Sequence, residues 1–123
     1  MLIIYHNPRC SKSRGALELA QQFATQHGLT LDVVDYQKTP LTQAQLTELH
    51  HVLQSEQAIS VRDMVRDNED EFTSLKLEHA NDASLLHALA THPKLLQRPI
   101  VRFNQRAVIA RPPELANAIL VAP

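Results

Sequence analysis

Residues 2–14, LIIYHNPRCSKSR, contain the clearest local signals for the fold of this chain. The apolar run at 2–5 has the length of a buried strand, and the Asn-Pro pair that follows is typical of a turn. From Ser11 onward, apolar residues recur at helical spacing as far as Gly28, a residue that can adopt the left-handed conformation that ends many helices. The stretch therefore predicts a strand, a loop and a helix, with the one cysteine of the chain, Cys10, in the loop.

A second strand and the start of another helix are predicted next. Residues 29–36 alternate in polarity and include β-branched side chains, so they are typical of a strand. Two strands joined by a helix indicate a parallel βαβ unit. Thr42 and Gln45 then form a capping-box pattern, which predicts a helix with an apolar face beginning at this point.

The middle of the chain is predicted to be helical, from about residue 42 to residue 92. Residues 60–66 open on Ser60 with the pattern of a short helix, and Asn81 or Asp82 can cap a longer one that ends before the His-Pro pair at 92–93. An acidic stretch with Asp67, Glu69, Asp70 and Glu71 lies between them, and we expect a solvated connection there because runs of charge are usually hydrated.

The last third of the chain predicts a β-hairpin and a closing helix. The β-rich runs 99–103 and 106–110 are separated by a polar two-residue turn, and the Pro-Pro-Glu sequence at 112–114 is typical of a helix start. The order is therefore βαβ, helices, ββα. This predicts one α/β domain over residues 1–123, with a mixed four-stranded sheet and a helical insertion.

Composition narrows the class of protein. The chain has 123 residues, of which 44% are hydrophobic and 20% charged, as expected of one compact domain. The apolar start is too short for a secretory signal, and no stretch is long enough to cross a membrane, so we expect a cytoplasmic protein. The net charge is −1 and the basic residues are scattered, which argues against nucleic-acid binding. No cysteine and histidine residues have the spacing of zinc ligands, so no metal site is predicted.

Cys10 is expected between the carboxyl end of a strand and the amino end of a helix. Free backbone N–H groups and the helix dipole favour negative charge at such a position, so they would lower the pKa of the thiol. Arg9, Lys12, Arg14 or a protonated His6 would act in the same direction. The alternative is that Cys10 is an inert, small apolar residue, which is common for a free cysteine.

The spacing around Cys10 excludes two kinds of thiol chemistry. A phosphatase-type loop needs an arginine after five intervening residues, but that position is Ala16, and Arg14 comes after only three. A dithiol oxidoreductase needs a second cysteine where the chain has Ser13, so no internal disulfide can form. A redox cycle through Cys10 therefore depends on thiols from other molecules.

Four motifs, in order along the chain, resemble those of the glutaredoxin-coupled, ArsC-type arsenate reductases. They are IYHNPRCSKSR, ISVRDMVR, HPKLLQRPIV and ARPPE. The resemblance implies a thioredoxin-like fold interrupted by a helical insert. It also implies arsenate as the substrate, glutathione as a co-substrate, glutaredoxin as a partner and no bound cofactor.

The resemblance also assigns roles to six residues. It implies that Cys10 is the nucleophile and that His6 helps to ionise it. The remaining positions would be three arginines that hold the oxyanion and a proline with a cis peptide bond, at Arg66, Arg98, Arg111 and Pro99. Arginines that present forked donors from separate segments suit a tetrahedral anion that a thiolate attacks.

Other arginines and other functions stay open at this point. Arg62 is a rival to Arg66, while Arg102 and Arg106 are further basic residues near the last two motifs. One alternative function is an ArsC-like thiol redox protein that acts on another substrate. Another is an Spx-like regulator that binds RNA polymerase, although such proteins typically have a second cysteine in place of Ser13.

Overall fold

A mixed four-stranded sheet forms the centre of the computed structural model, which describes residues 1–9 and 11–121. The strand order is β2-β1-β3-β4. β1 pairs with β2 in parallel and with β3 antiparallel, and β3 and β4 form an antiparallel hairpin. The mixed sheet expected from the sequence is thereby confirmed. The strands are β1 (Leu2–His6), β2 (Leu31–Asp35), β3 (Ile100–Phe103) and β4 (Arg106–Ile109).

One face of the sheet is covered by α1 (Ser11–His27) and by the 3-10 helix η4 (Pro113–Ala118), which pack against each other. Their contact is close, because a Cβ atom on Gly15 would lie 3.1 Å from the ring of Pro113. Gly28 follows α1 with φ of 64°, as expected for a helix end. The closing helix was expected to be a regular helix, but it is a 3-10 helix of six residues.

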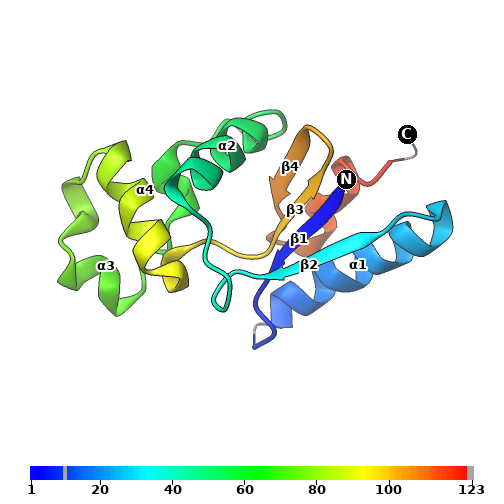
Figure 1. The fold of residues 1–123 in the computed structure, drawn as a ribbon, viewed down its shortest axis with the longest axis horizontal. Helices are drawn as coiled ribbons and strands as arrows, with labels where there is room; N and C mark the ends of the chain where they lie inside the picture. Colours follow the sequence, from blue (N-terminus) through cyan, green and yellow to red (C-terminus); the bar gives the residue numbers. More distant parts are fainter. Residues whose placement is uncertain (10, 122–123) are drawn as a thin grey trace.

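The helical insert lies between β2 and β3 and stands beside the sheet (Figure 1). Around residues 60–66 the structure forms a 3-10 helix of four residues, after which Val65 pairs with Leu96 in an isolated β-bridge. The acidic stretch is not wholly a connection, because α3 begins at Asp70. The insert consists of α2 (Gln43–Leu53), η1 (Val61–Met64), α3 (Asp70–Ser74), η2 (Leu77–His79), α4 (Asp82–Thr91) and η3 (Pro93–Leu95).

Both of the longer helices of the insert begin with a side-chain cap. At α2, Thr42 Oγ1 accepts a hydrogen bond from the Gln45 backbone N–H at 3.1 Å, and Gln45 Oε1 accepts one from the Thr42 N–H at 2.9 Å. This is the capping box that the sequence predicted. At α4, Asn81 Oδ1 accepts from the Ser84 N–H at 2.8 Å, so Asn81 rather than Asp82 is the cap.

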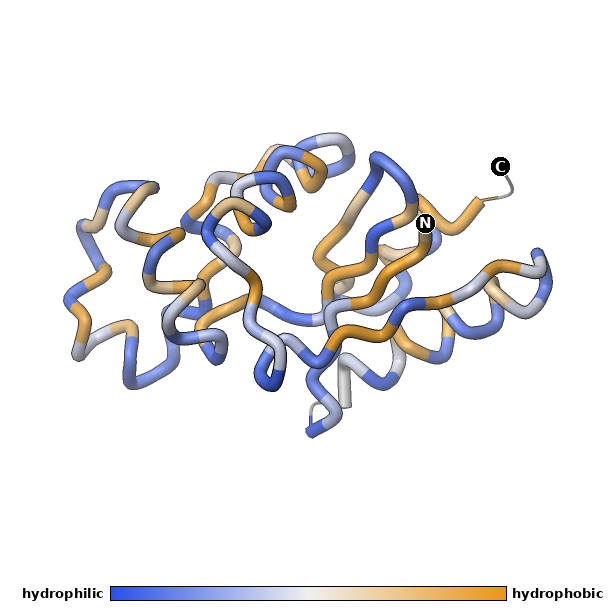
Figure 2. The backbone as a smooth tube through the Cα atoms, in the orientation of Figure 1, coloured by the Kyte–Doolittle hydropathy of each residue, from blue (hydrophilic) through white to orange (hydrophobic). Residues whose placement is uncertain are grey.

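Two apolar clusters lie on opposite faces of the sheet. Alternate residues of β1 point to opposite faces, so Ile4 belongs to the cluster under α1, whereas Tyr5 belongs to the cluster shared with the insert. Leu53 of α2 is fully buried in the second cluster. Figure 2 shows hydrophobic stretches along the strands of the sheet. The insert therefore shares a core with the sheet.

Strand register gathers three segments at the carboxyl end of β1. Tyr5 pairs with Ile100, which pairs in turn with Ile109, so His6 and the residues just outside the hairpin lie at the same end. The Ala110 N–H donates to the Pro99 carbonyl at 2.9 Å, which extends this contact. The peptide bonds before Pro99 and Pro112 are both cis. Within the described ranges, no helix is long and apolar enough to span a membrane.

Candidate functional site

The loop between β1 and α1 is shaped by two buried polar side chains, Asn7 and Ser13. Asn7 Oδ1 accepts a hydrogen bond from the Arg9 N–H at 3.0 Å, and the Asn7 N–H donates to Ser13 Oγ at 3.4 Å. Ser13 thus closes the loop at the position where a dithiol protein has its second cysteine. Cys10 itself lies outside the described residues, and α1 begins with the next residue in the chain.

His6 is the last residue of β1 and is 7% exposed. Burial lowers the pKa of His6 below its usual value of 6.5, and Arg14 adds to this, while Asp35 opposes it. The neutral imidazole is therefore favoured at neutral pH. A protonated His6, which the sequence offered as one source of positive charge for Cys10, is disfavoured by this burial.

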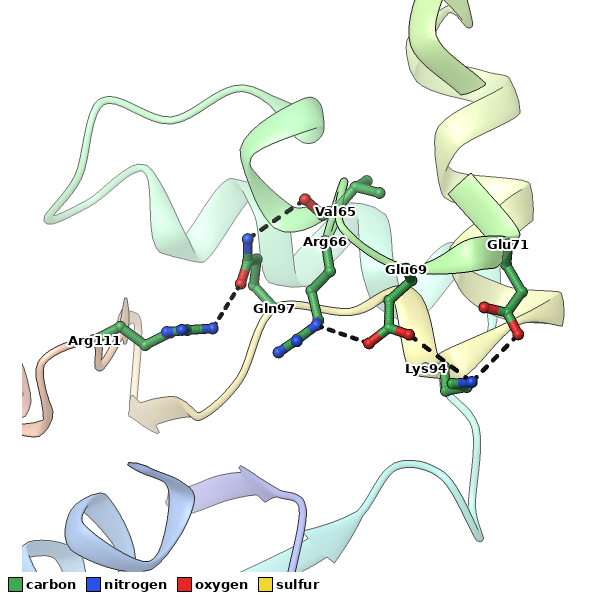
Figure 3. Close-up of polar contacts among 7 residues, drawn as sticks. All are labelled: Val65, Arg66, Glu69, Glu71, Lys94, Gln97 and Arg111. Carbon is green, nitrogen blue, oxygen red and sulfur yellow. Dashed lines mark hydrogen bonds and ion pairs between the residues drawn. The ribbon is translucent and has the colours of Figure 1, made fainter. Parts of the chain in front are cut away.

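A cleft of about 520 Å³ brings together two of the predicted anion-binding residues, Arg66 and Arg111. Amide side chains and two carboxylates also line it, and one of the carboxylates, Asp63, accepts a hydrogen bond from the Ser60 N–H at 2.8 Å. Figure 3 shows both guanidinium groups beside Gln97, which comes from the segment between η3 and β3. The other residues that line the cleft are Gln57, Ile59, Asp67, Asn68 and Ile109.

Arg66 reaches the cleft from the insert, and its backbone is anchored by its neighbours. Its N–H donates to the Leu95 carbonyl at 2.7 Å, next to the bridge between Val65 and Leu96. Its Nε lies 3.3 Å from Glu69 Oε1, an ion pair that lacks the angles of a hydrogen bond. The ion pair with Glu69 therefore occupies the Nε edge of the Arg66 guanidinium.

Arg111 follows β4 and reaches the same cleft from the sheet. Its Nη1 donates a hydrogen bond to Gln97 Oε1 at 3.3 Å. The close contact between Pro113 and Gly15 holds the neighbouring residues against the first turns of α1. Tertiary packing therefore joins the Arg111 segment to the helix that follows Cys10 in the chain.

Arg98 lies next to Gln97 in the chain and precedes the cis bond to Pro99. It is half-buried, and its Nε is buried without a hydrogen-bond partner in the part of the chain that the structure describes. Within that same part, no hydrogen bond or ion pair joins His6 to any of the three predicted arginines. The structure thus brings Arg66 and Arg111 together on one cleft, whereas Arg98 and His6 do not line that cleft.

Arg62 and the two further arginines near the last motifs donate hydrogen bonds to backbone carbonyls within the fold. Arg62 donates to the carbonyls of Leu77 at 3.1 Å and Ala80 at 2.7 Å. Arg102 donates to the Asn104 carbonyl at 2.9 Å and pairs with Glu48. Arg106 donates to the Ala118 carbonyl and pairs with Glu56. These bonds favour Arg66 over Arg62 as the residue available to a ligand.

The arrangement suits a multiply oxygenated anion. Two guanidinium groups face one cleft from segments 45 positions apart in the chain, and each offers planar, forked donors that match a tetrahedral oxyanion. Among the described residues, no group of three histidine, aspartate or glutamate side chains is placed to hold a metal ion.

Sequence reasoning missed Gln97 and Glu69, the side chains that contact the two arginines of the cleft. Gln97 directly precedes Arg98 inside a quoted motif, so its position was visible, but nothing in the sequence pairs it with Arg111. Glu69 was assigned to a solvated acidic stretch. Its carboxylate is instead mostly buried between Arg66 and Lys94.

Known proteins resemble this chain over nearly its whole length. A model of the ArsC family matches residues 5–119. A Neisseria meningitidis protein named arsenate reductase is 41% identical over 119 residues, or 95% of this chain and 96% of that protein. Escherichia coli YfgD, an uncharacterized protein, is 41% identical over 113 residues, or 90% and 89% of the two chains. A solved arsenate reductase from Vibrio cholerae has a TM-score of 0.83 and 38% identity, with 96% of each chain covered.

Proposed function

Since this chain belongs to the ArsC family, we propose that it reduces arsenate to arsenite, with Cys10 as the nucleophile and glutathione and glutaredoxin as the external thiols. The family resemblance implies this substrate, and relatives named arsenate reductase match almost the full length of the chain. The single cysteine of the chain supports the coupling to external thiols, because it cannot form an internal disulfide.

The observation that carries the proposal is the pair of arginines in one cleft. Arg66 and Arg111 come from the insert and from the end of the hairpin, and they line the same space of about 520 Å³. Arsenate carries negative charge on several oxygens, so two guanidinium groups can bind it at more than one oxygen and neutralise its charge. Arg98 would supply a third guanidinium from the same end of the sheet.

The proposed chemistry begins with attack of the Cys10 thiolate on As(V). An S–As bond forms, an arsenic–oxygen bond breaks and water leaves after proton transfer. A glutathione thiol then adds to the arsenic, and a second water leaves. A glutaredoxin thiolate then attacks the arsenic-bound glutathione sulfur, so that a glutaredoxin–glutathione disulfide forms, the glutathione S–As bond breaks and its electron pair stays on arsenic as As(III). Water finally cleaves the bond between Cys10 and arsenic, which releases arsenite and restores the Cys10 thiol.

The proposed role of His6 follows from its burial. A mostly neutral imidazole cannot stabilise the thiolate as a full positive charge, so its contribution would be a hydrogen bond to the sulfur or to the loop. The amino end of α1, which follows Cys10 directly in the chain, would then supply more of the electrostatic stabilisation of the thiolate.

The test is a coupled assay that contains the purified protein, arsenate, glutathione, a glutaredoxin and glutathione reductase. It measures the rate at which NADPH is oxidised. We expect oxidation that depends on arsenate and is abolished in Cys10→Ser. Arsenate should also slow alkylation of Cys10 in the wild type. Turnover that persists in Cys10→Ser would contradict the mechanism.

The same experiment distinguishes the proposed arsenate reductase from the second candidate function. A thiol redox protein with another substrate would show rapid alkylation of Cys10 at neutral pH but no oxidation with arsenate, and arsenate would not protect the thiol. That result would contradict the proposed substrate.

A further inference from the structure

Gln97 lines the cleft, and its side chain makes hydrogen bonds to Arg111 and to the backbone of Val65 (Figure 3). Its side-chain Oε1 accepts from Arg111 Nη1 at 3.3 Å, and its Nε2 donates to the Val65 carbonyl at 3.4 Å. Its backbone N–H donates to the Met64 carbonyl at 2.8 Å. One residue therefore contacts both the sheet-side arginine and the backbone just before Arg66.

These partners determine the orientation of the amide. Arg111 has donors and no acceptor, whereas the Val65 carbonyl is an acceptor. If the amide were rotated by half a turn, its NH₂ group would face the guanidinium and its oxygen would face the carbonyl. Gln97 is thus one of the few side-chain types that can satisfy both partners at once, because it has a donor and an acceptor at the same end.

From this geometry we infer that Gln97 is a positioning residue for the anion site, which holds the Arg111 guanidinium at a fixed distance and orientation from Arg66. The inference rests on the proposed function for the identity of the anion. Gln97 engages one nitrogen of Arg111, so the remaining N–H groups stay available for an oxyanion. Without Gln97, Arg111 would have to lose rotational freedom when the anion binds, and the affinity would fall.

If Gln97 positions the Arg111 guanidinium, two substitutions of Gln97 should have different effects. Gln97→Met keeps the length and most of the volume of the side chain but removes both hydrogen bonds. Gln97→Glu keeps an acceptor for Arg111 and loses the donor to Val65, so it restores the contact with the guanidinium. The added negative charge also offsets part of the positive charge of the two arginines, so anion binding stays weak in Gln97→Glu.

The first measurement is NMR of the arginine side chains in the ligand-free protein. Rotation of the Arg111 guanidinium about its terminal C–N bonds should be slow in the wild type, faster in Gln97→Met, and slow again in Gln97→Glu. The second is calorimetric titration with arsenate, in which we expect Gln97→Met to weaken binding about five- to tenfold, as for loss of a typical intramolecular hydrogen bond.

Thr42→Ala is the matched control, because it removes a helix cap in the insert and lowers stability without a contact to either arginine. Unchanged rotation of Arg111 in Gln97→Met, or an equal change in Thr42→Ala, would overturn the inference. Failure of the wild type to bind arsenate would instead count against the proposed function, and the NMR comparison would still decide the role of Gln97.

Discussion

His6 lies where β1 ends and the loop that carries Cys10 begins, and burial lowers its pKa. Between that lowered pKa and the value of 6.5 for an unperturbed histidine, the unfolded chain binds more protons than the folded one. The free energy of unfolding should therefore fall as the pH falls through this window.

This pH dependence can be measured directly. We expect the His6 imidazole to titrate below 6.5 in an NMR titration. In urea unfolding, His6→Gln should lose less stability than the wild type when the pH is lowered from about 7.5 to about 5.5. Equal losses in the two proteins would show that His6 is not responsible.

Arg62 and Arg66 are close in the chain but differ in their contacts, and lysine substitutions separate their roles. Arg66→Lys removes the planar fork from the cleft, so we expect KM for arsenate to rise about tenfold, with little change in stability. Arg62→Lys loses bonds to two carbonyls, so we expect unfolding to become easier by about 1–2 kcal/mol at unchanged KM. Assays of arsenate turnover and urea unfolding on both variants provide the comparison, and the reverse pattern would make Arg62 the ligand.

At the scale of elements, local sequence signals were reliable where side chains act on nearby backbone. The capping box of Thr42 with Gln45 and the Asn81 cap are each satisfied within three residues, so they could be identified without tertiary information. Segments without such signals were predicted less well. Residues 60–66 form only a short 3-10 helix, because Val65 leaves the helical path to pair with Leu96, more than 30 residues later.

The cap of α2 provides a prediction at this scale. Thr42→Ala removes the side chain that accepts from the Gln45 N–H, and we expect a loss of about 1 kcal/mol in the free energy of unfolding. Thr42→Ser, which retains the hydroxyl, should recover most of it. Urea unfolding of the two variants tests the cap, and an equal loss in both would refute its contribution.

In the molecule as a whole, the insert and the sheet are joined by one shared apolar cluster. Leu53 of α2 is fully buried in this cluster, together with Tyr5 and Ile100 of the sheet. A shared core of this kind couples the unfolding of the two parts.

Leu53→Ala tests that coupling. We expect a loss of about 2–5 kcal/mol, as for other large-to-small substitutions in a buried core. Unfolding followed by circular dichroism and by a probe placed in the insert should stay a single transition with one midpoint. Two separate transitions would mean that the insert unfolds independently of the sheet.

Sequence patterns alone predicted the order and type of most elements, the mixed sheet, the cap of α2 and the family. These features depend on periodicity, turn residues and side chains that act within a few positions, all of which can be seen in a linear chain. The motifs were also sufficient to name Arg66, Arg98, Arg111 and the nucleophile, Cys10, as candidates.

The sequence could not reveal which arginines line a common cleft or which side chains contact them, and the folded chain shows both. Arg62 proved to bind two carbonyls of the insert, and Gln97 proved to contact Arg111, because these partners lie 14 to 18 positions away in the chain. The physical reason is that the cleft forms where the insert meets the end of the hairpin. Contacts between distant segments depend on packing and strand register, and neither leaves a periodic signal in the sequence.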